Sequence, residues 1–223
     1  MIGCPTSGRP RPTSARIVLT SNTGLENRLR QALEQPAFWN DNRMVSKLAS
    51  LITGAVKGDH TDGMGNVYAT YEFERGTAAG PKNLDKMVKA FKNTVENLPD
   101  NVQSVTVDLP AKLPDGVDRG DLLRELAELS ALSRYNYNFH KKFQYPTSRL
   151  KNVTFNKRGL ASGQAEKAVQ EGNTIGQAMN LARHFVDAPA NVNTTRYMST
   201  RAKALASPTL QVQVREKAWL EGK

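Results

Sequence analysis

Hydrophobic and polar positions change their period several times along the chain. Apolar side chains occupy every second position at 67–73, 105–109 and 153–155, which is typical of half-buried strands. Apolar residues spaced three or four apart, as on one face of a helix, lie at 84–95, 122–132 and 165–186. Strands and helices that alternate in this way predict an α/β architecture, with helices covering a sheet.

Shorter signals extend this pattern toward both ends. The apolar run at residues 17–19 predicts an edge strand, and the alternation at residues 210–214 predicts a last strand. Pro189 ends the helix at 165–186, and Asn193 or Thr194 can cap the helix that follows. Asp121 is the residue we expect to cap the helix at 122–132.

Composition divides the chain into three parts. The first 25 residues contain no acidic residue and are rich in Arg, Pro, Ser and Thr, so we predict a disordered or extended basic tail at 1–25. Segments that target proteins to organelles share this composition. Near residue 160 a strand-rich half gives way to helices, which predicts one α/β domain at 26–160 and the beginning of a second at 161–223.

The segment 171–195 carries the clearest resemblance to a known family. It resembles the helix and turn that lead into the catalytic domain of leucyl aminopeptidases (cytosol aminopeptidases), with the pattern Ala-Arg-x-Leu-Val-Asn-x-Pro-x-Asn. The matching residues are Ala182, Arg183, Val186, Pro189 and Asn191, while Phe185 and Asp187 replace the usual Leu and Asn. A second segment, 128–142, is similar to a family helix that ends in an aromatic run followed by Lys.

The resemblance implies a mixed sheet flanked by helices as an N-terminal accessory domain at 26–160, followed by the truncated start of the catalytic domain at 161–223. Full-length family members are hexameric exopeptidases that remove N-terminal residues with two divalent metal ions, zinc or manganese. Their metal ligands lie downstream of the turn and include an Asn-Thr-Asp-Ala-Glu-Gly-Arg stretch, which these 223 residues do not contain. We therefore expect no catalytic residue, metal ligand or cofactor here, whether the chain is a fragment or has lost the catalytic domain.

Other candidate sites have simpler structural interpretations. Asp59, His60 and Asp62 lie in a Gly-rich loop and would need a further ligand from elsewhere to hold a metal ion, so we favour a solvated turn. His184, inside the long helix, is expected to be a packed or capping residue. Cys4 has no paired base, and a single cysteine excludes an internal disulfide. No apolar run approaches the roughly 20 residues that cross a bilayer.

Charge favours a rival hypothesis. The net charge of +10 has two interpretations. It can attract a polyanionic partner such as nucleic acid, or it can contribute to solubility alone. Seven cations with no acidic residue among them are candidate RNA contacts: Arg134, Lys141, Lys142, Arg149, Lys151, Lys157 and Arg158. The aromatic rings between them can stack on unpaired bases or pack in the core. The chain would then be a non-catalytic subunit of a large assembly, such as a mitochondrial ribosome. The family resemblance favours the cytosol, and the basic start favours mitochondria.

Overall fold

The computed structural model describes residues 14–21, 66–72, 74–98, 102–137, 150–157 and 159–222. The strands are β1 (Ser14–Ser21), β2 (Asn66–Tyr71), β3 (Ser104–Asp108) and β4 (Asn152–Asn156). The helices are α4 (Gly80–Glu96), α5 (Arg119–Leu132), α6 (Ser162–Asp187), α7 (Thr195–Lys203) and α8 (Lys217–Glu221), and a 3₁₀ turn, η1 (Thr77–Ala79), precedes α4. This alternation confirms the predicted α/β architecture.

The four described strands form one parallel sheet in the order β2-β1-β3-β4. β1 lies inside the sheet, where Ile17 is opposite Val67 on one side and Val107 on the other. The prediction of an edge strand at residues 17–19 is therefore wrong. Strand order depends on crossover connections, which the local pattern of residues does not contain. β1 also falls inside the range predicted as a basic tail, so its eight residues are sheet rather than tail.

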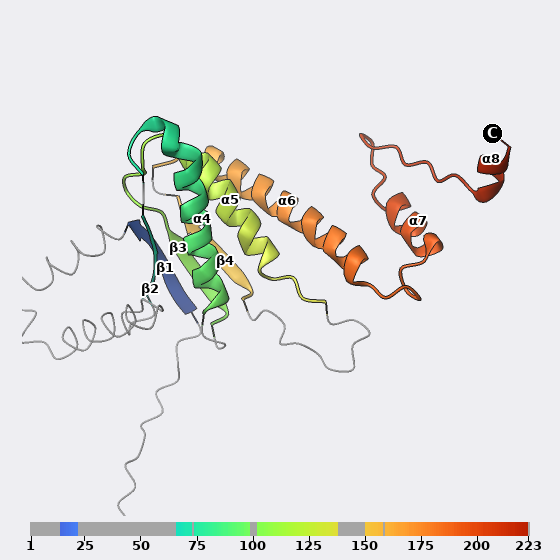
Figure 1. Ribbon diagram of the computed structural model, residues 1–223, viewed down its shortest axis with the longest axis horizontal. Coiled ribbons are helices and arrows are strands. Elements are labelled where there is room, and N and C mark those ends of the chain that lie inside the picture. Colours follow the sequence, from blue (N-terminus) through green and yellow to red (C-terminus); the bar gives the residue numbers. More distant parts are fainter. Residues whose placement is uncertain are drawn as a thin grey trace, which may run out of the picture.

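Alternation along the strands separates an apolar face from a polar face. The apolar face of the sheet packs against α4 and α5, which lie on the same side of it (Figure 1). The larger apolar side chains with no exposed surface are Ile17, Val107, Met87, Phe91, Leu122, Leu123 and Leu126. On the other face Asp108 accepts hydrogen bonds from Arg16 at 2.5 Å and from Asn156 at 3.1 Å. The period-two pattern therefore predicted correctly which strand residues form the core.

α5 begins three residues before the start expected from the sequence. Asp118, not Asp121, is its N-cap, because the Asp118 Oδ1 accepts the backbone N–H groups of Gly120 and Asp121 at 2.7 and 2.9 Å. Asp121 lies in the first turn, where its negative charge interacts favourably with the helix dipole. The capping prediction was wrong in residue and correct in chemistry.

α6 packs against α5 through a stripe of small residues. The buried positions of the helix are Ala165, Ala168, Gly172 and Gly176. The helix expected from the apolar spacing at 165–186 is present, but of its apolar residues Ala168, Ile175, Met179 and Val186 only Ala168 is buried. Val186 is 84% exposed. Two helices approach closely only where their side chains are small. The face of α6 that contacts α5 is therefore the one with the smallest side chains, not the most hydrophobic one.

The chain turns at Pro189 and α7 follows. Thr194, one of the two caps that the sequence allowed, caps α7 by accepting the backbone N–H of Tyr197 at 3.2 Å. Residues 211–216 are not a strand, so the prediction of a last strand at residues 210–214 is wrong. These residues lie away from the sheet with α7 and α8, beyond the end of α6 (Figure 1). Alternating apolar residues do not form a strand without a neighbouring strand to pair with.

Candidate functional site

The two segments that resemble leucyl aminopeptidases meet at the C-terminal ends of α5 and α6. The Tyr135 hydroxyl donates a hydrogen bond to Asp187 Oδ2 at 2.8 Å across 52 residues of sequence. The ring of Tyr137 lies 5.4 Å from that of His184, centre to centre. Burial, followed by the bond to Asp187, raises the pKa of Tyr135 to about 12, so this phenol stays protonated at neutral pH.

The same cluster reaches across the turn to α7. His184 Nε2 is 3.1 Å from the Tyr197 hydroxyl, and the rings of Phe185 and Tyr197 meet edge to face with their centres 6.4 Å apart. Asn193 donates its side-chain N–H to the backbone carbonyl of Phe185 at 2.6 Å. His184 is therefore packed among aromatic rings, in agreement with the structural role expected for it.

Three of the seven cations predicted to contact RNA lie in the described part of the chain. Arg134 donates from Nε to the Ser130 carbonyl at 2.9 Å and from Nη1 to the Lys151 carbonyl at 3.4 Å, so the fold brings Arg134 next to Lys151. Lys157 instead forms an ion pair with Glu166 at 2.7 Å. Lys157 and the hydroxyl of Ser162 hold the pKa of Glu166 below its usual range.

The remaining four cations, Lys141, Lys142, Arg149 and Arg158, lie outside the described residues. The seven were predicted to act together on one surface. Of the three that are described, Arg134 and Lys151 adjoin, whereas the charge of Lys157 is neutralised by its neighbour. The RNA-binding set therefore stays a prediction.

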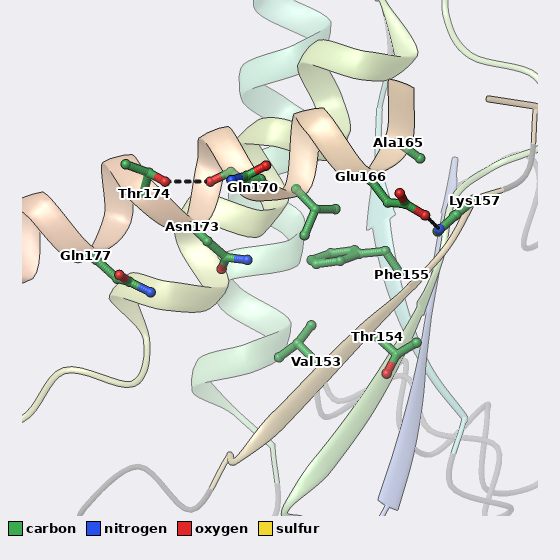
Figure 2. Close-up of a pocket in the computed structure, with 11 residues that line it drawn as sticks. Val153, Thr154, Phe155, Lys157, Ala165, Glu166, Gln170, Asn173, Thr174 and Gln177 are labelled. Atoms are coloured by element: carbon green, nitrogen blue, oxygen red, sulfur yellow. Dashed lines mark hydrogen bonds and ion pairs between the residues drawn. The ribbon is translucent and has the colours of Figure 1, made fainter. Parts of the chain in front are cut away.

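A groove of about 520 Å³ runs between β4 and α6 (Figure 2). Its apolar floor is formed by Val153, Phe155 and Val169, and the Lys157–Glu166 ion pair lies at one end. The α6 side presents a row of polar side chains, namely Gln170, Asn173, Thr174 and Gln177. The volume falls within the range of about 300–1,000 Å³ that is typical of ligand sites.

A second, more polar cavity of about 360 Å³ adjoins the groove, because Gln177 lines both. Its other lining residues are Ala131, Arg134, Tyr135, Asn136, Asn180 and His184. The carboxamides on this side of α6 were not among the residues predicted from the sequence. Gln170, Asn173, Gln177 and Asn180 are three or four residues apart, so they share a helix face, and this spacing was available as a signal.

Within the described ranges, no three His, Cys, Asp or Glu residues are grouped closely enough to hold a metal ion. The loop with Asp59, His60 and Asp62 and the single cysteine, Cys4, lie outside those ranges. The described side chains therefore do not fit the two metal ions of leucyl aminopeptidases, and no catalytic step is assigned to them. Among the described helices, none is long and apolar enough to cross a membrane.

The chain is similar to known proteins both in sequence and in structure. No protein-family model matches the chain. Over 105 residues, 44% of the chain, it is 31% identical to a probable cytosol aminopeptidase of Idiomarina loihiensis, and the match covers 21% of that protein.

One of the solved structures that the chain resembles is the bottromycin maturation enzyme BotP in complex with Mn. It superimposes on 87% of the chain with a TM-score of 0.55 and 17% identity, and 36% of BotP is covered. The chain thus spans about a fifth of one protein and about a third of the other. It is similar in sequence to a cytosol aminopeptidase over less than half of its residues, and it shares its fold with part of BotP.

Proposed function

We propose that the chain belongs to a leucyl aminopeptidase-like protein, as its accessory α/β domain together with the first elements of its catalytic domain. The observation that supports this most directly is the Tyr135–Asp187 hydrogen bond, because it joins the two segments that resemble the family. The resemblance of each segment was judged from sequence alone. If the chain has the family's fold, the two segments are expected to contact each other. Two similarities that arose by chance would have no reason to do so.

In this proposal the chain is a scaffold and not a catalyst. α6 and the turn at Pro189 connect the accessory domain to elements of the catalytic domain, and the bonds around His184 and Asn193 set the direction in which the chain leaves α6. Zinc or manganese ions would be bound only by the catalytic part of a full-length protein. Assembly into homo-oligomers belongs to the same proposal.

An activity assay tests the non-catalytic assignment. The purified chain, incubated with leucine p-nitroanilide and zinc or manganese, is expected to release p-nitroaniline no faster than the metal ions alone, since it carries no Asn-Thr-Asp-Ala-Glu stretch. Release that saturates with substrate and stops when a chelator is added would contradict this assignment.

A chimera tests the accessory role itself. In this chimera, residues 1–188 of this chain replace the matching N-terminal portion of a cytosol aminopeptidase, and the enzyme's own sequence continues after Ala188. The chimera should preserve the metal-dependent turnover and the oligomeric state of the parent enzyme. The parent enzyme is the control. A chimera that folds, as judged by circular dichroism, but neither assembles nor turns over substrate would show that the chain is not an equivalent domain.

The alternative is a non-catalytic structural subunit of a large assembly that contacts RNA, for example in mitochondria. Arg134 and Lys151 favour it, because both are exposed and they adjoin, and within the described part of the chain Arg134 bonds to backbone carbonyls alone. The ion pair of Lys157 with Glu166 argues against it. A cation that is already neutralised releases few of the counterions condensed on a phosphate backbone, and this release drives binding. A salt-dependent titration with RNA, described below, separates the two hypotheses.

A further inference from the structure

Among the described strands, β4 pairs with β3 on one side and has no neighbour on its outer edge. Asn152 donates its backbone N–H toward β3, to the Gln103 carbonyl at 3.2 Å. Backbone groups alternate in direction along a strand, so Val153 and Phe155 direct their N–H and C=O groups away from β3. No described strand pairs with β4 on that side. These two residues therefore present two donors and two acceptors along the groove.

The side chains around this edge suit an extended polypeptide. Val153 and Phe155 are half-buried and project toward α6, where they form an apolar floor (Figure 2). Gln170, Asn173 and Gln177 form the opposite wall. Carboxamides donate and accept hydrogen bonds, as the peptide groups of a bound chain require. An added strand would place every second side chain on the apolar floor.

Positive charge lies where the second cavity adjoins the groove, because Arg134 lines that cavity. Arg134 lies at the start of β4, beside the Lys151 carbonyl, and both side chains are exposed. Among the described residues, Arg134 hydrogen-bonds to backbone carbonyls and forms no ion pair. The opposite end of the groove is closed by Lys157 and Glu166, whose charges cancel. The groove and the adjoining cavity together thus have a cationic end near the beginning of β4 and a neutral end beyond it.

We infer that this groove binds the C-terminal segment of a polypeptide as an additional strand, antiparallel to β4, with the terminal carboxylate at Arg134 and Lys151. The direction follows from the charge, because an antiparallel strand ends where β4 begins. Strand addition at an exposed sheet edge and capture of a terminal carboxylate are both general modes of peptide recognition. The inference does not depend on the proposed aminopeptidase relationship, since it uses only the edge, the groove and the two cations.

The direct test is binding of the complete chain to an array of hexapeptides with randomised C-terminal positions, each printed once with a free carboxylate and once as the amide. Binding is expected to prefer the free carboxylate by about tenfold or more, because a charge-assisted hydrogen bond is lost in the amide. Absence of any peptide that binds in a carboxylate-dependent way would overturn the inference.

Variants then locate the site with the best peptide, labelled at its N-terminus, by fluorescence anisotropy. Val153→Pro removes an N–H that faces the edge and keeps the pairing with β3, as proline is tolerated on that side of an edge strand. It should weaken binding by tenfold or more, whereas Val153→Ala, which keeps the N–H, should have a smaller effect. Equal affinities of wild type and Val153→Pro, with the fold retained, would exclude strand addition.

The cationic end has its own control. Arg134→Gln and Lys151→Gln should each weaken binding of the free carboxylate and leave binding of the amide unchanged. Lys167→Gln removes the same charge from the outer surface of α6, where Lys167 pairs with Glu171 at 3.9 Å, and should have no effect. If Lys167→Gln weakens binding as much as the other two, the attraction is only overall charge and the assigned carboxylate site is wrong.

Two further measurements use no peptide variant. Amide hydrogen exchange of residues 150–157 should slow when the peptide is bound, since Val153 and Phe155 would gain hydrogen-bond partners. Analytical ultracentrifugation tests whether a second copy of this chain occupies the edge instead. If the wild-type chain is a dimer and Val153→Pro is a monomer, the edge of β4 is occupied by a second copy of the chain and not by a peptide. That result would overturn the inference.

Discussion

Asn83 has no exposed surface, although its side chain is fully polar. Its Oδ1 accepts the backbone N–H of Glu74 at 2.8 Å, and its Nδ2 donates to the backbone carbonyl of the same residue at 2.9 Å. The carboxamide therefore pairs with the chain just after β2 as a neighbouring strand would. A buried carboxamide is stable only when such partners are present.

Replacing Asn83 should therefore destabilise the fold strongly. Asn83→Ala leaves both backbone groups of Glu74 without partners and is expected to lower the free energy of unfolding by about 2–4 kcal/mol. Asn93→Ala, the same substitution at an exposed position of α4, should change it by less than about 0.5 kcal/mol. Urea denaturation followed by circular dichroism measures both. Equal stabilities of the two variants would mean that the contact with Glu74 contributes little.

Tyr71 should make stability depend on alkaline pH. Burial raises its pKa from 10 to about 12, so the unfolded chain loses this proton at a lower pH than the folded chain does. The contribution to stability is complete below pH 10 and is lost as the pH rises through 12. Tyr71→Phe should remove this loss. The urea midpoint, measured at pH 8 and pH 11 for both proteins, checks it, and parallel declines in both would assign the effect to other groups.

At the scale of elements, the contact between α5 and α6 is decided by glycine. A Cβ atom added to Gly172 would lie 2.1 Å from the Arg124 carbonyl oxygen, and one added to Gly176 would lie 2.7 Å from the Glu128 carbonyl oxygen. Both neighbours are backbone atoms of α5, which do not move unless the helix moves. The absence of a side chain at these positions therefore sets the distance between the helices.

Gly172→Ala should push α5 and α6 apart, in spite of the higher helix propensity of alanine. We expect a loss of about 1–3 kcal/mol in the free energy of unfolding, the usual cost of overpacking. Gly163→Ala is the matched control, because no atom lies within 4 Å of its added Cβ. It should be neutral or stabilise by up to about 1 kcal/mol. Thermal unfolding of both variants tests the pair, and a stabilised Gly172→Ala would show that the helices tolerate separation.

The same helix shows how far sequence predicts an element. Its length and its end before Pro189 followed from the spacing of apolar residues and the proline. Its contact face did not, because hydrophobicity pointed to Ile175 and Met179, which are about 40% exposed (39% and 41%). Packing distance depends on the partner helix, and no local pattern in α6 identifies α5 as that partner.

At the scale of the whole molecule, the net charge of +10 allows a test of the RNA hypothesis. If the predicted cations contact phosphates, the slope of log affinity against log salt should be about −0.7 to −0.9 per contact. Replacing Lys141, Lys142, Arg149 and Lys151 together by Ala should weaken binding and flatten that slope. Circular dichroism of the variant is expected to show that the fold is retained. An RNA titration at two salt concentrations compares wild type and variant. Equal affinities and slopes would reject this surface as the contact.

The candidate sites divide along similar lines. The resemblance of 128–142 and 171–195 to one family was visible in sequence, but only folding showed that Tyr135 and Asp187 bond to each other. The cations were also visible, whereas the neutralisation of Lys157 by Glu166 was not. The groove beside β4 was not predicted at all, because a groove is a property of two elements and the space between them.

Sequence by itself determined the α/β class, the spans of most elements and the apolar face of the strands that alternate with period two, and it narrowed the cap of α7 to Asn193 or Thr194. These follow from interactions between residues close along the chain, whose period and chemistry the sequence records directly. Only the tertiary structure decided that β1 lies inside the sheet, that α6 meets α5 through Gly172 and Gly176, and that β4 pairs on one side only among the described strands. Each of these depends on which distant segments pack together. That choice is made by the combined burial and steric fit of the whole chain, and no single segment encodes it.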